Sequence, residues 1–210
     1  MNLVEMTVNQ YLETVASDAP APGGGSASAL CGAQGADLAA MVAGLTLGKK
    51  KYPLDQELCA AAVETGKRLA ASLTAQIDRD TDAYNLIAAA YRLPKEGDKE
   101  RIVRSLAIAD ATMTATEVPY QTLQFANAGL ILVESLVGHS NANCASDLGV
   151  AALNLLACAR GAWLNVCINL PGVTDEARAH EFRTEGKRML EQCEARAAAA
   201  YEALRAAVEE

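Results

Sequence analysis

The chain has 210 residues, of which 51% are hydrophobic but only 4% aromatic, so its core must be built mainly from Ala, Leu, Val and Ile. This length suffices for one large domain, and Ala-rich runs without helix breakers predict an all-α fold. A net charge of −8 argues against a surface that binds nucleic acid or an anionic membrane.

The first predicted element is a short amphipathic helix that begins after Thr7 and ends at the turn Ser17-Asp18. Thr7 can cap its free N–H groups, and four apolar residues share one face: Val8, Tyr11, Leu12 and Val15. The residues before it lack the hydrophobic core of a signal peptide, which favours a cytoplasmic protein.

A loop rich in proline and glycine, residues 20–28, opens into a second helix. Its Gly23, Gly24 and Gly25 leave room for a ligand to approach the main chain. The first N–H groups of the helix lack intrahelical partners, so with Ser26 they can bind an anion or a polar ligand edge. A nucleotide P-loop is excluded because no Lys-Ser/Thr pair follows at the required spacing. A plain flexible helix start is the alternative.

The second helix is expected at residues 26–47, where small residues recur every four positions: Ser28, Gly32, Ala36, Ala40 and Gly44. A stripe without side-chain bulk allows another helix to pack closely. This helix is therefore predicted to be central or to lie between subunits. Asp37 lies within the run, and a structural cap or subunit contact is favoured for it over catalysis.

Three consecutive lysines, Lys49, Lys50 and Lys51, follow the second helix and form the clearest positive patch of an acidic chain. Cations near a helix C-terminus stabilise the helix dipole, which is one explanation for them. Binding of an anionic ligand is the other, and the residues alone leave both open.

A third, long helix is expected from Pro53 to Tyr91, and its apolar face runs through Leu73, Ile77 and Tyr84. Asp80 falls on that face by periodicity. A carboxylate that points inward is costly unless it is paired or used, and its pKa tends to rise. A functional role is favoured here over a buried structural carboxylate.

The chain then turns at Leu93-Pro94-Lys95, and a fourth helix is expected at residues 98–137, where Pro119 should kink it or divide it in two. The last helix, residues 174–208, is charged on one side and apolar on the other, as an outer packing helix would be.

A polar cluster from Asn141 to Asp147 leads into the fifth helix, residues 148–170. Capping explains one or two of these polar side chains, and the cluster holds more of them than capping needs. Near the end of the same helix, Asn165 and Asn169 lie one turn apart on the same side.

The cysteines form no CxxC pair, and most lie in apolar helical runs: Cys31, Cys59, Cys144, Cys158, Cys167 and Cys193. Buried reduced thiols are favoured over disulfides or a zinc site. With His139 and His180 as the only histidines, no metal site is expected. No apolar stretch is interpreted as a membrane span.

In this order, the segments resemble the cyclodeaminase/cyclohydrolase family of folate enzymes. Any one motif is weak, but the ordered set is specific and covers most of the chain. The motifs are Pro22-Gly23-Gly24-Gly25-Ser26, Leu45-Thr46 with Gly48-Lys49-Lys50-Lys51-Tyr52, Asp80-Thr81-Asp82-Ala83-Tyr84 ahead of Leu93-Pro94-Lys95, Val118-Pro119, Asn141 to Asn143, Ser146-Asp147 and Asn165-Val166-Cys167-Ile168-Asn169.

The resemblance implies one helical domain over residues 1–210, built from five or six helices around a small-residue central helix, and a homodimer with a folate-binding cleft. It implies a tetrahydrofolate substrate, with or without a polyglutamate tail, no tightly bound cofactor and Asp80 as the catalytic residue. The implied substrate-binding residues are Gly23, Gly24, Gly25, Ser26, Lys49, Lys50, Lys51, Tyr84, Asn143 and Asp147.

Hydrolysis of 5,10-methenyltetrahydrofolate to 10-formyltetrahydrofolate is the favoured activity. The Gly-Lys-Lys-Lys-Tyr stretch resembles the stand-alone cyclohydrolases of the family, and no formiminotransferase domain accompanies it in these residues. The alternatives are a formiminotetrahydrofolate cyclodeaminase that releases ammonia, and a non-catalytic folate-binding or oligomeric scaffold. An inward carboxylate beside a glycine loop argues against the scaffold, which needs neither.

Overall fold

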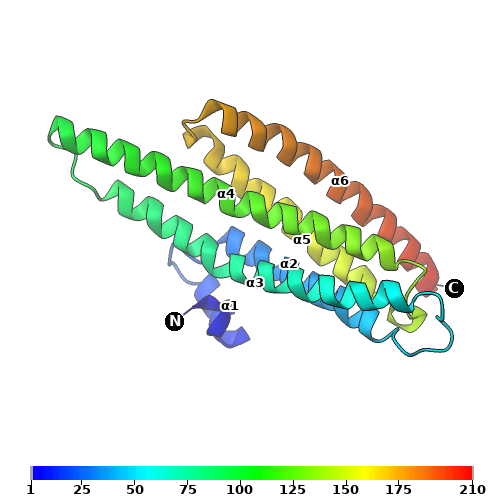
Figure 1. Ribbon diagram of the computed structural model, residues 1–210. Coiled ribbons are helices and arrows are strands. Elements are labelled where there is room, and N and C mark those ends of the chain that lie inside the picture. The colour runs from blue at the N-terminus through cyan, green and yellow to red at the C-terminus, as the bar shows by residue number, and fades with distance from the viewer. Residues whose placement is uncertain (1, 210) are drawn as a thin grey trace.

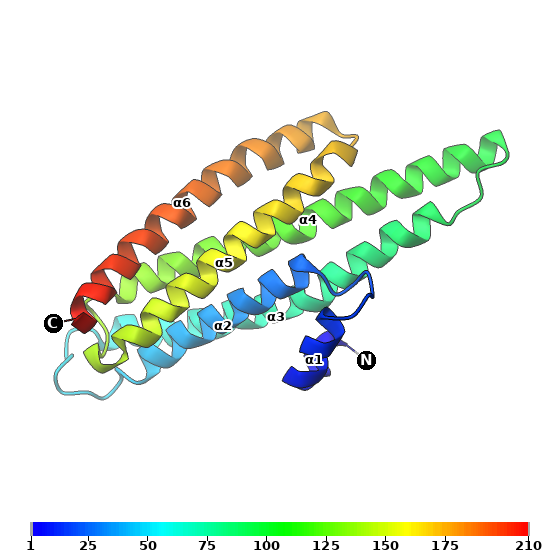
Figure 2. The same cartoon turned by 180° about the vertical axis from the view of Figure 1, so that it is seen from behind.

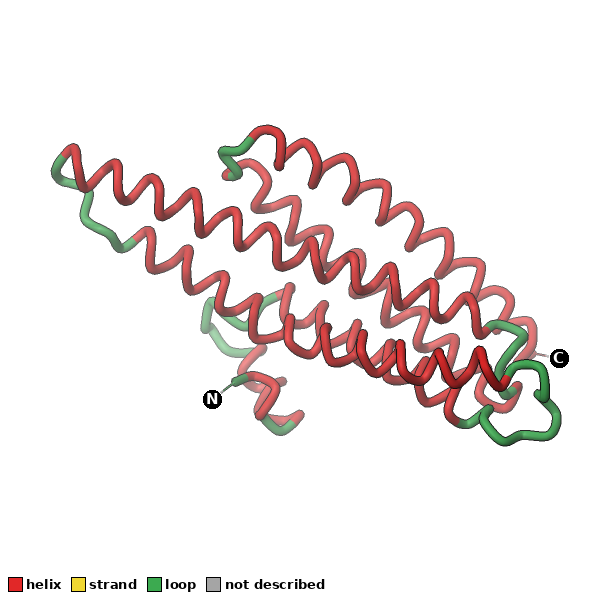
Figure 3. Tube along the Cα trace, in the orientation of Figure 1, coloured by secondary structure: helices red, strands yellow, loops and turns green. Residues whose placement is uncertain are grey.

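The computed structural model describes residues 2–209, and this part of the chain folds into helices without strands, as predicted (Figure 3). The α-helices are α1 (Val8–Val15), α2 (Gly24–Gly44), α3 (Gln56–Tyr91), α4 (Asp98–Leu136), α5 (Ala145–Asn169) and α6 (Glu176–Glu209). Three short 3-10 helices complete the order: η1 (Leu3–Glu5), η2 (Ala142–Cys144) and η3 (Leu170–Gly172). The expected six α-helices are therefore all present among the described residues.

The helices α2 to α6 lie roughly along one direction and form an elongated bundle, with α1 beside the start of α2 (Figure 1). The helices α3 and α4 form a long hairpin whose tip projects beyond the others. Seen from behind, α2 lies in front of α3, and α5 lies in front of α4 (Figure 2). The bundle thus has one broad face made by α2 and α5 and an opposite face that includes α4.

The small residues of α2 allow close packing in the middle of the bundle, which confirms its predicted central position. A Cβ atom added at Gly32 would lie 2.6 Å from the Sγ atom of Cys158, and one at Gly35 would lie 2.7 Å from Leu155. Both neighbours belong to α5. Larger residues at these positions would force the two helices apart.

The start of α3 differs from the prediction, because the helix begins at Gln56 and Pro53 lies in the preceding turn. The Gln56 side chain explains the later start. Its Nε2 donates to the Tyr52 carbonyl at 2.7 Å, and its Oε1 accepts from the Gly48 N–H at 2.7 Å. These bonds hold residues 48–55 as a separate turn in front of the helix.

The helix α4 is continuous through Pro119, so of the two outcomes predicted for this proline, a kink or a division, the division is wrong. Proline lacks the N–H that would bind the carbonyl of Ala115. That carbonyl instead accepts a hydrogen bond of 2.8 Å from the Asn169 side chain at the end of α5. The replacement bond removes the cost of an unpaired buried carbonyl at this position.

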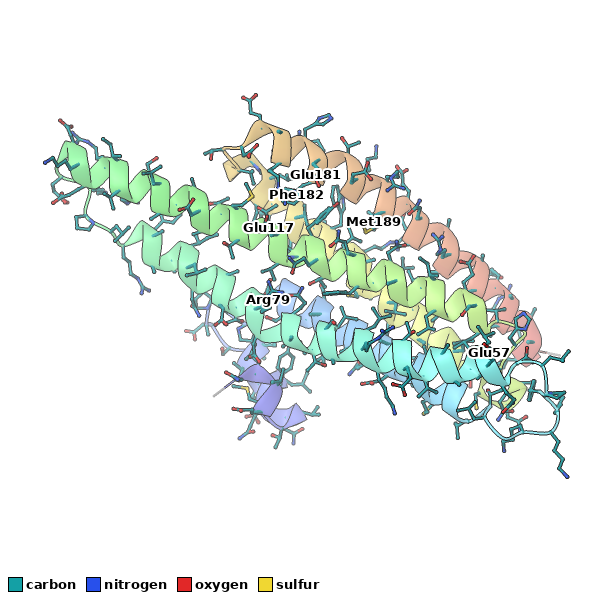
Figure 4. All side chains as sticks on the ribbon, viewed as in Figure 1. Glu57, Arg79, Glu117, Glu181, Phe182 and Met189 are labelled. Atoms are coloured by element: carbon teal, nitrogen blue, oxygen red, sulfur yellow. The ribbon has the colours of Figure 1, made fainter. Side chains whose placement is uncertain are left out.

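The outer helix α6 packs on α4 and α5, as its two-sided composition predicted. The Phe182 ring lies 5.0 Å from the Tyr120 ring, measured between centroids. Next to it, the Arg178 guanidinium forms ion pairs of 2.9 Å with Glu117 and 2.7 Å with Glu181. Glu117 projects from α4 toward the segment of α6 that carries Glu181 and Phe182 (Figure 4).

The apolar character of α5 follows from its position in the bundle. The segment Ala142–Gly172 has a mean hydropathy of 1.4 and is long and apolar enough to cross a membrane by composition, although no span was predicted from the sequence. Leu148, Leu155 and Val166 of α5 are fully buried against neighbouring helices. Of the apolar window in this segment, 39% is buried, and packing inside the bundle accounts for that share.

Four cysteines are buried free thiols, as predicted: Cys59, Cys144, Cys158 and Cys193. Cys31 is half-buried and also free, whereas Cys167 is exposed and does not follow the prediction. Burial raises the pKa of the Cys193 thiol to about 12, which keeps it protonated and unreactive at neutral pH.

Candidate active site

A cavity of about 200 Å³ lies where the start of α2 meets the C-terminal third of α3 and the end of α5. Of the described residues that line it, Asp80 alone carries a charge. The lining residues are Pro20, Ala21, Gly23, Gly24, Gly25, Asp80, Ala83, Tyr84, Ile87, Ala115, Asn165, Ile168 and Asn169. The structure therefore brings the glycine loop, Asp80 and Tyr84 together as the sequence predicted.

Ser26 holds one oxygen of the Asp80 carboxylate. The backbone N–H of Ser26 donates to Oδ2 at 2.8 Å, and its hydroxyl lies 3.1 Å from the same oxygen. The hydroxyl also lies 2.8 Å from the carbonyl of Ile77, one turn before Asp80. Within the described chain no group donates to Oδ1, so that oxygen stays free at the cavity.

Burial shifts the protonation of Asp80. Removal from water raises the pKa of its carboxyl group above the ordinary value, and the two hydrogen bonds from Ser26 lower it in part. A carboxylate with a raised pKa is a stronger base than one in water. The site thus combines one anchored oxygen with one free, basic oxygen.

Gly25 is required by the position of Asp80. A Cβ atom at residue 25 would overlap the Asp80 carboxylate, and only glycine leaves that space empty. At Gly24 the nearest neighbour of an added Cβ is the Nδ2 atom of Asn165 at 3.6 Å, and at Gly23 nothing lies within 4 Å. The three glycines therefore have different roles, and Gly25 makes room for the carboxylate.

Two asparagines that were not predicted as site residues line the cavity, Asn165 and Asn169. The Nδ2 atom of Asn165 donates to the Gly161 carbonyl at 2.8 Å. The Nδ2 atom of Asn169 donates to the carbonyls of Ala115 and Asn165 at 2.8 and 3.0 Å. Since each amide nitrogen is engaged, the side-chain oxygens remain as acceptors. Their one-turn spacing at the end of an apolar helix was the sequence signal for them.

The other predicted substrate-binding residues do not line this cavity, and their role stays a prediction: Lys49, Lys50, Lys51, Asn143 and Asp147. They lie at the other end of α2, a helix of 21 residues that spans about 30 Å. There the Ala142 N–H donates to the Tyr52 hydroxyl at 2.9 Å. This bond joins the loop that carries the three lysines, called the lysine loop below, to the segment just before α5. The distance between these residues and the glycine loop could not be inferred from the sequence.

Comparisons with known proteins find similar sequences over most of the chain. A family model described as Formiminotransferase-cyclodeaminase matches residues 7–188. The chain is 38% identical over 202 residues to a methenyltetrahydrofolate cyclohydrolase from Methylorubrum extorquens, covering 96% of this chain and 97% of that protein. It is 32% identical to formimidoyltransferase-cyclodeaminase from Gallus gallus, covering 90% of this chain but 34% of that protein, about a third of its length.

A solved structure has a similar fold. The crystal structure of formiminotetrahydrofolate cyclodeaminase from Thermotoga maritima matches with a TM-score of 0.79 and 27% sequence identity. The match covers 97% of this chain and 96% of that chain.

Proposed function

Because the chain belongs to the formiminotransferase-cyclodeaminase family, we propose that it is a methenyltetrahydrofolate cyclohydrolase, a hydrolase that acts on a cyclic amidine. It hydrolyses 5,10-methenyltetrahydrofolate to 10-formyltetrahydrofolate. The relative in Methylorubrum extorquens that bears this name is similar over almost the whole length of both proteins.

The free Oδ1 atom of Asp80, in a cavity whose described lining residues carry no other charge, carries the proposal. The substrate is an amidinium cation, and a carboxylate nearby attracts that cation. Glycine N–H groups and asparagine oxygens around it offer donors and acceptors to the bicyclic end of the folate. The ring of Tyr84 gives the same cavity a flat apolar wall.

In the first step, water attacks the methenyl carbon while the free oxygen of Asp80 takes a proton from it. A C–O bond forms, and the positive charge of the amidinium is lost in a tetrahedral adduct. Ser26 keeps the other carboxylate oxygen in place throughout. The raised pKa of Asp80 suits this transfer, because the carboxylate accepts a proton more readily than in water.

In the second step, protonated Asp80 returns its proton to N5, and the bond between N5 and the former methenyl carbon breaks. The adduct hydroxyl loses its proton to solvent as the formyl C=O forms on N10. Water and the methenyl cation thus yield 10-formyltetrahydrofolate and one proton. We propose that no resident cofactor takes part.

The test follows the decay of methenyltetrahydrofolate absorbance and, in parallel, ammonia release from 5-formiminotetrahydrofolate, with spontaneous rates subtracted. Faster hydrolysis without ammonia supports the cyclohydrolase. Ammonia release supports the cyclodeaminase, which the structural match to the Thermotoga maritima enzyme keeps as the second candidate. Inactivity of the folded protein in both assays contradicts the proposal and leaves a non-catalytic scaffold.

We further propose a cytoplasmic homodimer that packs through the face of α2 and α5. This face exposes apolar side chains on both helices: Met41, Leu45, Val150, Leu153, Leu164 and Ile168. Asp37 of α2 lies on it too, beside Met41 and Asn154, which suits the subunit contact favoured for it. A two-fold axis across this face would place the end of α2 that leads into the three lysines of one subunit beside the glycine loop of its partner.

In that arrangement, Lys49, Lys50 and Lys51 hold the glutamate tail of a folate bound to the partner. The double variant Lys50→Ala/Lys51→Ala should raise KM about 3- to 10-fold for substrates with long glutamate tails and leave kcat unchanged. The variant Lys187→Ala, an exposed lysine of α6, is the control. Equal KM values for short- and long-tailed substrates in the double variant would remove the lysines from the site.

A further inference from the structure

Pro119 is a buried proline in the interior of a continuous helix, a position that normally costs about 3 kcal/mol of stability. It does not line the cavity, and the reaction steps above do not use it. The missing N–H of Pro119 nevertheless changes the hydrogen bonding of a residue at the cavity. Residue 119 has no N–H, so the carbonyl of Ala115, a residue that lines the cavity, is left without its helical partner.

The Asn169 side chain uses that vacant carbonyl. One hydrogen of its amide goes to the Ala115 carbonyl at 2.8 Å, and the other goes to the Asn165 carbonyl at 3.0 Å. With both hydrogens engaged on two different helices, the amide cannot flip without losing both bonds. Its Oδ1 atom is therefore kept as an acceptor at the cavity.

A residue with a backbone N–H at position 119 would compete for the same carbonyl. A regular α-helix closes this bond between residues i and i−4, along the helix axis. The Ala115 oxygen would then be drawn back toward the axis of α4 and shared between two donors, which weakens one of the two bonds that orient the Asn169 amide. Proline thus makes a carbonyl available to another helix.

We propose that Pro119 is a positioning residue for folate binding, which acts by freeing the Ala115 carbonyl to orient the Asn169 amide toward the substrate. This inference rests on the proposed function. Methenyltetrahydrofolate carries N–H donors on its bicyclic end, and the fixed Oδ1 of Asn169 is the acceptor for one of them. This hydrogen bond recognises the bicyclic ring of the substrate, whereas Asp80 acts on the methenyl carbon.

The test is a double-mutant cycle with Pro119→Ala and Asn169→Ala, measured as KM and kcat for methenyltetrahydrofolate hydrolysis. One hydrogen bond to the substrate corresponds to a KM about 3- to 10-fold higher in N169A. The P119A variant should raise KM by about 3-fold with kcat unchanged. The double variant should match N169A alone, because Pro119 acts only through that side chain.

A control separates this effect from general damage to the helix. Thr122→Ala removes a buried side chain from α4 whose hydroxyl donates to the Val118 carbonyl, 3.1 Å away. It should lower Tm without changing KM. If P119A does not fold, Pro119→Val supplies the same N–H with a volume closer to that of proline, and the same outcomes apply.

A second readout does not depend on activity. In the wild-type protein the side-chain NH₂ signals of Asn169, assigned by their loss in N169A, should show slow hydrogen exchange in NMR spectra. In P119A their exchange should become faster. Unchanged exchange, or KM effects that multiply in the double variant, would overturn the inference even for an active enzyme. Slow exchange in an inactive wild-type protein would instead count against the proposed function alone.

Discussion

At the scale of single residues, the catalytic role proposed for Asp80 carries a consequence for stability. The fold raises the pKa of its carboxyl group, so the folded state favours the protonated form. The stabilising contribution of protonation is therefore complete below the ordinary Asp pKa of about 4 and is lost as the pH rises through the raised value. At neutral pH the ionised carboxylate is a net cost to folding.

Asp80→Asn should thus abolish turnover and stabilise the fold. We expect a loss of at least about 100-fold in kcat, because general acid–base catalysis is removed. At pH 7 we expect a Tm roughly 2–4 °C higher than that of the wild type, and this difference should vanish near pH 3. Calorimetry at both pH values checks the stability. Full turnover in D80N would exclude Asp80 as the catalytic residue.

Ser26 tunes the same group, and its hydroxyl can be tested separately. Since the hydroxyl hydrogen bond lowers the pKa of Asp80, Ser26→Ala should raise that pKa further. The acid limb of the profile of kcat/KM against pH should then move about 0.5–1 pH unit upward. Ser28→Ala is the matched control, because its hydroxyl bonds to the Gly24 carbonyl instead. An unmoved limb in folded S26A would mean that Asp80 does not set it.

At the scale of elements, α2 packs closely on α5, which places the glycine loop beside the end of that helix. Gly35→Ala would place a Cβ atom 2.7 Å from Leu155 and 2.9 Å from the Ala151 carbonyl, so it should destabilise by about 1–3 kcal/mol. Gly44→Ala meets only Val63 at 3.8 Å and should gain up to about 1 kcal/mol from helix propensity. Urea denaturation measures both. Equal stability of the two variants would contradict the tight contact.

At the scale of the whole molecule, the exposed apolar face predicts association. Leu153→Glu places a charge on that face, where the wild-type side chain is 45% exposed, and should convert the proposed dimer to a monomer. Ile131→Glu changes a residue of α4 that is 46% exposed and should leave the dimer intact. Light scattering during size-exclusion chromatography gives both masses. A monomeric wild-type protein would remove the proposed interface.

Local sequence patterns determined the elements of this protein. Periodic apolar residues and the absence of breakers specified the helices, because these signals act within one or two turns. The stripe of small residues marked α2 as central for a reason that is also local, since it leaves no bulk on one face. The inward position of Asp80 followed from the period of α3.

Only the tertiary structure decided which of the predicted site residues meet. It placed Ser26 on one oxygen of Asp80 and separated the lysine loop from that carboxylate by the length of α2. It also paired the Ala115 carbonyl with Asn169, residues 54 positions apart in the chain. The physical reason is that hydrogen bonds between helices depend on how the helices are stacked and aligned. A pattern along one helix carries no information on that alignment.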